Sequence, residues 1–403
     1  MWLLAMSLYV AGEVRITVQA GPYDRTDCVV SADVSGLILK ENSVVELYEE
    51  SGKQKRRIPS QLVIEGDDAR LYWILDGETR SGVSRSFVVR KVKKTQVEEP
   101  LMMVEDTRKS LILKKKEKSI LQYNYTHVEP PSGADPSYGR SGFIHPAYSP
   151  GGNVLTTIQP KDHYHHYGIW NPWTRIMYDG NMYDLWNLRD KQGTVKARNI
   201  ERVYSGDIFA GYDANLDHYI FQPDEEKVIL NEQWRIKAWN IPDGFLWDFE
   251  SHFNPSTALP VLIKEYRYAG FGYRATEDWT KDNCEMFTSE GKTRQQIDGT
   301  NARWIYITGD TKTGRSGLLF MGYPDNYNSP EPLRIWDENA NGGRGDAFIN
   351  FAPTKNKDWE LKPDEHYLLR YRIFSYEGEM TKEKAERLWN DFAHPPTVVT
   401  INN

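Results

Sequence analysis

Apolar and polar residues alternate in short runs over the first quarter of the chain. Val14, Ile16 and Val18 alternate with Arg15 and Thr17, and this period of two places the apolar side chains on one face of a strand. Similar runs occupy residues 44–48, 62–64, 71–75 and 87–92. Turn-forming clusters such as Gly66-Asp67-Asp68 separate the runs. Evenly spaced short strands predict an immunoglobulin-like β-sandwich over residues 13–95.

The apolar runs become longer and richer in Trp and Tyr in the rest of the chain. They occupy residues 228–239, 246–253, 261–268, 304–308, 317–321 and 367–376. Residues 96–118 are rich in Lys and Glu and are predicted to link the domains, with room for a strand at 110–113. We therefore predict an all-β chain whose second domain, residues 119–403, is a large antiparallel β-sandwich.

One helix is predicted, close to the end of the chain. Ala385, Leu388, Trp389 and Phe392 recur at helical spacing. Thr381 precedes them as a candidate cap, and Pro395-Pro396 ends the run. The large domain should therefore carry one short C-terminal helix.

Composition narrows the classes of function. The 403 residues are 27% charged and 39% hydrophobic, with a net charge of −7, so the chain is globular and carries no basic stripe for nucleic acid. No apolar run reaches the roughly 20 residues of an integral membrane span. Residues 2–11 match the core of a secretory signal, or else a first buried strand. We expect a signal remnant over 1–12 and a periplasmic or extracellular protein.

Five of the nine histidines lie between His127 and His166. His163 and His165 are two residues apart, so on an extended strand they share a face and His166 lies on the other. With His145 from a preceding strand, they could hold a divalent metal. Imidazoles equally bind sugar hydroxyls or transfer protons, and hydrogen-bonded structural histidines would look the same.

Two further segments carry charges at alternate positions. Glu265 and Arg267 share one face of the predicted strand 261–268. Glu290, Lys292 and Arg294 would also share a face if extended, and such a row can hold an anion while the carboxylate acts as a base. A structural ion pair and a solvated edge strand are the respective alternatives.

Aromatic residues make up 13% of the chain, and several follow the histidines directly. Trp170 and Trp173 are candidate platforms for sugar rings, because indoles offer a flat apolar face and a polar edge. Phosphate-cradling glycine loops, nucleophile elbows, HExxH motifs and cysteine zinc patterns are all missing from the sequence. With only Cys28 and Cys284, neither a disulfide framework nor a cysteine metal site is indicated.

Eight short motifs spread over nearly the whole chain form a specific set. They are Gly21-Pro22-Tyr23-Asp24-Arg25-Thr26-Asp27, Gly142-Phe143-Ile144-His145-Pro146, Tyr148-Ser149-Pro150, Asp162-His163-Tyr164-His165-His166, Glu265-Tyr266-Arg267-Tyr268, Thr288-Ser289-Glu290-Gly291-Lys292-Thr293-Arg294, Asn350-Phe351-Ala352-Pro353 and Leu388-Trp389-Asn390-Asp391. The set resembles the bacterial family labelled PmoA or "methane oxygenase", which is of essentially unknown function and occurs in bacteria rich in polysaccharide-degrading systems. The resemblance implies a second domain akin to the supersandwiches of sugar-processing, galactose-mutarotase-like enzymes.

Our leading hypothesis is an exported carbohydrate-active enzyme, a hydrolase or lyase acting on a glycan. His145, His163 or His166 would act as acid or base with Glu265 or Glu290 as its carboxylate partner. The expected substrate-binding residues are His165, Trp170, Trp173, Arg267, Lys292 and Arg294.

Two other classes stay open. One is a metal-dependent enzyme, an oxygenase for example, with His145, His163 and His165 as ligands. The other is a non-catalytic glycan-binding protein. No cofactor other than such a metal is indicated, and the oligomeric state is open.

Overall fold

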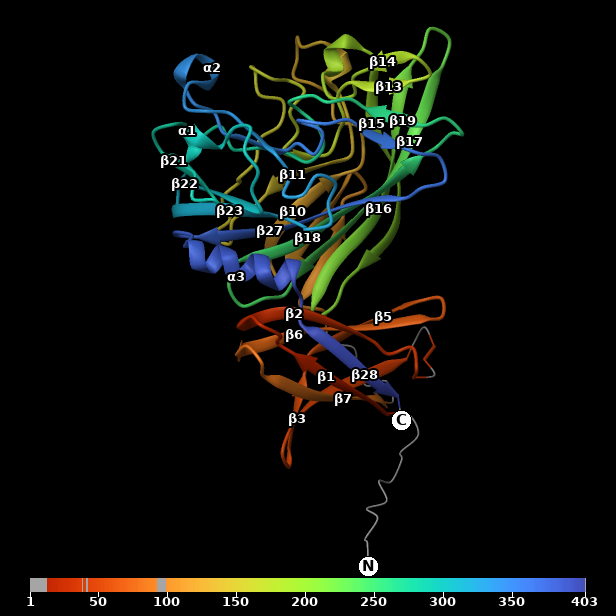
Figure 1. Cartoon of the computed structure of the whole chain (residues 1–403), viewed down its shortest axis with the longest axis vertical. Helices are drawn as coiled ribbons and strands as arrows, with labels where there is room; N and C mark the ends of the chain where they lie inside the picture. Colours follow the sequence, from red (N-terminus) through yellow and green to blue (C-terminus); the bar gives the residue numbers. More distant parts are fainter. Residues whose placement is uncertain (1–12, 38, 41–42, 93–98, 403) are drawn as a thin grey trace, which may run out of the picture.

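The structure, a computed structural model, describes residues 13–37, 39–40, 43–92 and 99–402. It is all-β, as predicted, with a small sandwich below a large one in Figure 1. The predicted signal remnant, residues 1–12, lies outside the described residues.

The small domain is a sandwich of two antiparallel sheets. One sheet runs in the order β28 (Thr397–Asn402), β1 (Glu13–Gln19), β7 (Ser84–Val92), β3 (Val44–Ser51) and β4 (Gln54–Ile58), and the other in the order β2 (Arg25–Asp33), β6 (Asp68–Thr79) and β5 (Ser60–Glu65). Val14, Ile16 and Val18 are buried on β1, as their alternation predicts. The sandwich expected over 13–95 gains β28 from the far end of the chain, which pairs with β1.

Three sheets build the large domain, and the first contains β8 and β9, from the segment expected to be a linker. It runs β24 (Leu333–Ile335), β25 (Phe348–Phe351), β20 (Gly272–Arg274), β12 (Ile169–Trp170), β11 (Phe143–Ala147), β10 (Lys118–Asn124), β9 (Ser110–Lys115) and β8 (Met102–Asp106). The strand expected at 110–113 is present as β9. The described part of the expected linker, residues 99–118, nevertheless belongs to the large domain, because Met102, Leu111 and Leu113 are buried in the main core.

The second sheet is also eight-stranded, and its inner face packs on the first across the main core. It runs β15 (Gly193–Tyr204), β16 (Phe209–Phe221), β17 (Glu226–Trp239), β18 (Phe245–Pro255), β27 (Tyr367–Glu377), β23 (Gly314–Gly322), β22 (Trp304–Thr311) and β21 (Cys284–Thr288). A four-stranded sheet of β14 (Asn181–Tyr183), β13 (Ile176–Tyr178), β19 (Val261–Ile263) and β26 (Trp359–Leu361) completes the domain.

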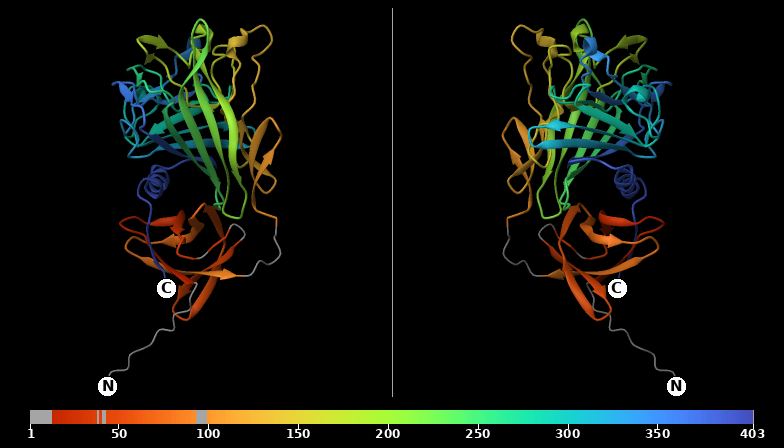
Figure 2. Two further views of the ribbon diagram at one scale, coloured as in Figure 1. Left: turned by 90° about the vertical axis from the view of Figure 1, so that its right-hand side faces the viewer. Right: turned by 90° about the vertical axis from the view of Figure 1, so that its left-hand side faces the viewer.

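The predicted C-terminal helix is α3 (Lys382–Ala393), and its cap is confirmed, since Thr381 Oγ1 accepts a hydrogen bond from Lys384 N. The helix lies between the outer face of the second sheet and the small sandwich (Figures 1 and 2). Its Trp389 and Phe392 join a cluster that includes Val29 of the small domain. No helix in the described part of the chain is long and apolar enough to cross a membrane.

The other helical turns are short: η1 (Pro136–Tyr138), η2 (Leu188–Asp190), α1 (Arg294–Ile297) and α2 (Ala340–Gly343). Cys28 is buried, Cys284 is half-buried, and both thiols are free.

Glu331 makes the stability of the large domain depend on pH. It is buried between Tyr371 and Asn326, which donate hydrogen bonds of 2.6 and 3.0 Å to its carboxyl oxygens. Burial raises the pKa of Glu331 to about 7. The folded protein therefore keeps a proton that the unfolded chain has released, so the free energy of unfolding falls as the pH rises from about 4.3 to about 7.

We expect Glu331→Gln to remove a pH-dependent contribution of roughly 3 kcal/mol. Urea unfolding of both proteins at several pH values across this window measures the difference in slope. Parallel pH profiles for wild type and variant would contradict the assignment.

Candidate functional site

The three adjacent histidines lie in a turn rather than on a strand. His163 N donates to Pro160 O and His166 N donates to His163 O, at 2.9 and 3.0 Å. The turn stacks the rings of His163 and His166, with centroids 4.8 Å apart, and sets the ring of His165 edge-on to both. The expectation of one shared strand face is wrong, because the turn brings all three rings into one cluster.

His163 is oriented by a carboxylate. Its Nδ1 lies 2.7 Å from Asp162 Oδ2, and its side chain is 29% exposed. Asp162 also accepts hydrogen bonds from Arg274 and Asn341, at 3.0 and 2.8 Å. Although burial acts to raise the pKa of Asp162, the His163 hydrogen bond and the Arg274 charge hold it well below its usual range. A charged Asp162 favours the tautomer with the proton on Nδ1, which leaves Nε2 of His163 as an acceptor.

His163 lines a cavity of about 360 Å³. Trp336 lies against it, with ring centroids 4.6 Å apart, and the buried guanidinium of Arg274 lies over the indole. The other lining residues are Arg267, Tyr268, Asp298, Arg334, Ile335, Asp337, Asn339, Ala340 and Asn341.

Two guanidinium groups flank Tyr268 in this cavity. Arg267 and Arg334 lie 5.3 and 5.1 Å from its ring centroid. Arg334 forms an ion pair of 3.0 Å with Asp298, whereas Arg267 is exposed and has no carboxylate within ion-pair distance among the described residues. Arg267 thus lines the cavity with an unpaired guanidinium among the described residues, and its substrate-binding role stays a prediction.

Burial favours the neutral form of His165 and His166. Burial lowers the pKa of His165 to about 3 and that of His166 well below its ordinary value. His166 is 1% exposed and lies between Trp170 and Phe348, so it cannot reach a substrate. The predicted catalytic role of His166 is therefore not supported by its position. His165 is half-buried and does not line the cavity, so its predicted binding role is not supported at this cavity.

His145 does not join this cluster. Its Nδ1 lies 2.9 Å from Thr156 Oγ1 and it makes no ring contact with the other histidines, while burial lowers its pKa to about 4. Among the described residues, no group of three or more His, Cys, Asp or Glu side chains is placed to hold a metal ion. The proposed ligand set of His145, His163 and His165 is thus not assembled.

Neither predicted glutamate reaches His163. Glu265 is exposed beyond the end of β19 at Ile263, and Glu290 is exposed 3.9 Å from Arg303. Alternate residues do not share a face here, because both segments leave the strand conformation, and Gly291 has a φ of +75°. Asp162 takes the place that these two glutamates were expected to fill.

Arg294 supports the cavity wall from behind, instead of binding substrate. It is buried and donates to the backbone carbonyls of Trp336, Gly345 and Asp346, at 3.1, 2.7 and 2.9 Å. Lys292 is partly exposed and does not line the cavity.

Replacing Arg294 with Met should destabilise the protein by roughly 2–4 kcal/mol, because several buried charge-assisted hydrogen bonds are lost. Thermal and urea unfolding measure this loss. If the variant were as stable as the wild type but bound substrate more weakly, Arg294 would be a substrate-binding residue after all.

Trp170 and Trp173 are buried and are not ligand platforms, contrary to expectation. Trp170 packs on Trp186 with centroids 5.1 Å apart, and Trp173 packs on Phe253 in the main core. Trp336 is the indole that lines the cavity.

Most of the residues that surround His163 were not predicted from the sequence. Asp162 is adjacent in sequence and carried a signal, since a carboxylate beside a histidine can orient it. The other residues around His163 lie more than 100 positions further along the chain, and nothing in the sequence indicated that they would be near it. They are Arg274, Arg334, Trp336 and Asn341.

Comparison with known proteins gives a family but no activity. The profile of a family described as "Family of unknown function (DUF6807)" matches residues 110–390, which agrees with the expected lack of an established function. No curated protein matches the chain. A solved structure of a galactose mutarotase related enzyme from Lactobacillus acidophilus matches with a TM-score of 0.34 and 7% identity, over 68% of this chain and 97% of that chain. The PmoA label stays a prediction.

Proposed function

We propose that this chain, which belongs to the family of unknown function DUF6807, is an exported carbohydrate-active enzyme that uses His163 as its proton-transfer group. The observation that carries the proposal is the contact of 2.7 Å between His163 Nδ1 and Asp162, at the wall of a 360 Å³ cavity. A histidine held by a carboxylate, whose second nitrogen has no hydrogen-bond partner in the described part of the chain, is the arrangement of a general base. Export rests on the apolar run at residues 2–11.

The cavity lining supports a polyhydroxylated ligand that carries an acidic group. Guanidinium, carboxylate and amide groups make the paired hydrogen bonds that vicinal hydroxyls accept and donate, and Trp336 and Tyr268 add aromatic surface. Arg267 has no carboxylate partner in the described structure, so it is available to a carboxylate of the ligand.

Of the two reaction classes, elimination fits the lining better than hydrolysis. Glycoside hydrolysis uses two carboxyl groups that flank the scissile bond. Of the two carboxylates in the lining, Asp298 is bound to Arg334, and Asp337 accepts a hydrogen bond of 2.8 Å from Asn339 N. Asp162, behind His163, is bound to Arg274 and His163. Asp337 is thus the one lining carboxylate without a cation partner among the described residues, whereas hydrolysis needs two carboxyl groups. A lyase needs a base at C5 of a uronate and a cation at its carboxylate, which His163 and Arg267 would supply.

Incubation with acidic polysaccharides, such as polygalacturonate and alginate, and with neutral glucans tests the proposal. We expect ultraviolet absorbance from unsaturated uronates with acidic substrates alone. New reducing ends without that absorbance would indicate a hydrolase. Saturable binding without turnover would indicate a non-catalytic binder and overturn the enzyme assignment.

The metal-dependent alternative has a separate test. Elemental analysis of the purified protein, and activity before and after treatment with a chelator, would detect a required metal. Stoichiometric metal with loss of activity on chelation would favour that alternative over the proposal.

A further inference from the structure

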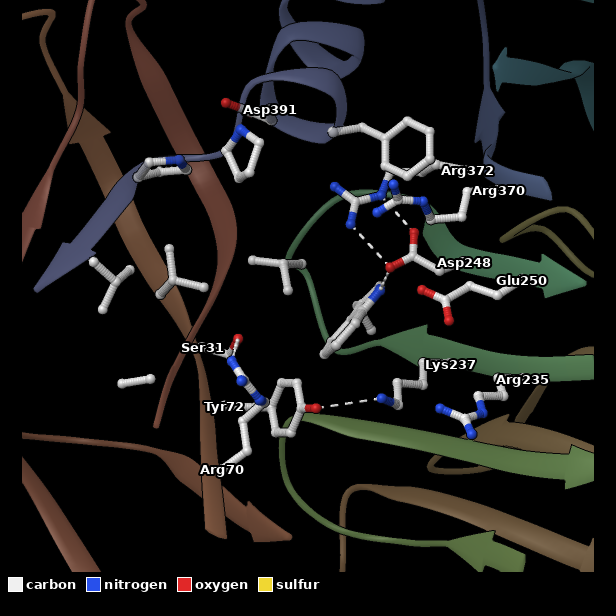
Figure 3. Close-up of a pocket in the computed structure, with 18 of the residues that line it drawn as sticks. Ser31, Arg70, Tyr72, Arg235, Lys237, Asp248, Glu250, Arg370, Arg372 and Asp391 are labelled. Atoms are coloured by element: carbon white, nitrogen blue, oxygen red, sulfur yellow. Dashed lines mark hydrogen bonds and ion pairs between the residues drawn. The ribbon is translucent and has the colours of Figure 1, made fainter. Parts of the chain in front are cut away.

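A second and larger cavity lies between the two domains, far from the motifs that drew attention to the histidines. It has a volume of about 540 Å³, and none of its lining residues lines the His163 cavity. Figure 3 shows Arg70 and Tyr72 of β6 on one side and residues of β17, β18 and β27 on the other. The outer face of the large sheet is therefore only partly covered by the small domain.

Charged residues form rows across the sheet at this cavity. Arg235, Glu250 and Arg370 are in register on β17, β18 and β27. The neighbouring row contains Lys237, Asp248 and Arg372. These rows bring several cations and carboxylates to one face of the sheet. The charge that a ligand would meet there depends on which cations form ion pairs with carboxylates and which do not.

The carboxylates that line the cavity are already engaged. Asp248 accepts hydrogen bonds of 2.6 and 2.9 Å from Arg372, and Asp391 accepts one of 3.0 Å from Arg25. Glu250 lies 3.0 Å from a ring nitrogen of His252, and Asp33 accepts from Ser35 N at 2.8 Å. Glu250 also stands between Arg235 and Arg370 in its row, so its charge acts on both of these cations.

Three cations at the cavity have no carboxylate within ion-pair distance among the described residues: Arg70, Arg235 and Lys237. Their donors meet only neutral oxygens, at Ser31, Gln233 and Tyr72, with distances of 3.3, 2.7 and 3.3 Å. The lining carries five Arg and Lys side chains against four carboxylates, and two of these carboxylates are paired with Arg372 and with Arg25, which lies outside the lining. Positive charge therefore exceeds negative charge at the cavity.

Arg370 adds a fourth cation that is weakly paired. It lies over the Tyr323 ring, 3.5 Å from its centroid, and its ion pair with the exposed Asp325 is 3.6 Å long. Surface pairs of this kind contribute little and are readily exchanged for a ligand.

The spacing of these cations suits a ligand with two anionic groups. Arg235 and Lys237 are two residues apart on one strand, or about 7 Å, and Arg370 lies two strands away from Arg235, or about 10 Å. A single small anion cannot contact all of them. We propose that the interdomain cavity binds an acidic oligosaccharide, whose carboxylates or sulfates contact these cations.

Calorimetric titration of the full chain with digalacturonate, and with cellobiose as a neutral comparator, tests this site. The variant Arg235→Gln/Lys237→Met should bind digalacturonate about tenfold more weakly or worse, because two charge-assisted contacts are lost. The matched control is Lys196→Met/Arg198→Gln, which removes two cations at the same spacing from β15 of the same sheet. It should change the affinity by less than about twofold, because both residues lie outside the cavity.

The outcomes separate this site from the His163 cavity. Absence of digalacturonate binding, equal affinity for cellobiose, or equal losses in the two double variants would each overturn the inference. Binding that is lost only in Arg267→Gln would place the probe in the His163 cavity, which contradicts the interdomain site and leaves the proposed function standing.

Discussion

Replacing His163 with Ala is expected to lower kcat by about a hundredfold to ten-thousandfold, the usual contribution of a positioned acid or base. The side chain is partly exposed at the cavity, and its one hydrogen bond to a described residue is to the neighbouring Asp162. Its removal should therefore cost little stability, and the loss should appear in turnover. Steady-state kinetics on the acidic glycan that the wild type degrades, with thermal unfolding in parallel, measures both quantities.

His252 provides a matched control for this experiment. It is 33% exposed and lies 3.0 Å from a carboxylate oxygen of Glu250, so it resembles His163 in exposure and in its acidic partner. It lies on the outer face of the large sheet, and His252→Ala should keep kcat within about twofold. Equal activity of the two alanine variants would exclude His163 as the proton-transfer group.

Asp162→Asn separates orientation from proton transfer. The amide cannot stabilise a protonated His163, so kcat should fall and its pH dependence should shift, while the affinity for substrate changes less. An unchanged pH profile would mean that Asp162 only shapes the turn.

Local sequence patterns predicted individual strands and helices better than they predicted which strands pair with one another. The alternation on β1 and the helical spacing that ends at Phe392 are each satisfied within one segment, so the sequence shows them directly. The long strand β16 was missed, since Gly211, Asp213 and Asn215 disfavour a strand in isolation. Pairing with β15 and β17 on both sides overrides that preference.

The site was harder to predict because its geometry depends on turns and on distant segments. His163 and His165 were placed on a shared strand face, yet the turn after Pro160 stacks His163 on His166 instead. Arg274 reaches Asp162 from β20, across 112 positions of sequence. A period in the sequence indicates which face a residue occupies only where the segment is regular, and it carries no information about such long-range contacts.

Replacing Arg25 with Met should produce the largest loss of stability, about 3–5 kcal/mol, because it leaves a buried carboxylate without its partner. Arg25 is 1% exposed and donates to Asp391 at 3.0 Å, and also to the carbonyls of Ala20, Asn390 and His394. It thereby joins the small sandwich to the end of α3. Urea unfolding monitored by Trp fluorescence measures the loss, and separate transitions would show that the two domains had uncoupled.

The double variant Arg25→Met/Asp391→Leu distinguishes a lost attraction from an unpaired charge. Burial raises the pKa of Asp391 even beside Arg25, so the charged carboxylate is costly once the guanidinium is gone. Removing both charges should therefore recover much of the stability that the single variant loses. A double variant that is no more stable than Arg25→Met would show that the hydrogen bonds from Arg25 to the backbone hold the domains together, and that the ion pair contributes little.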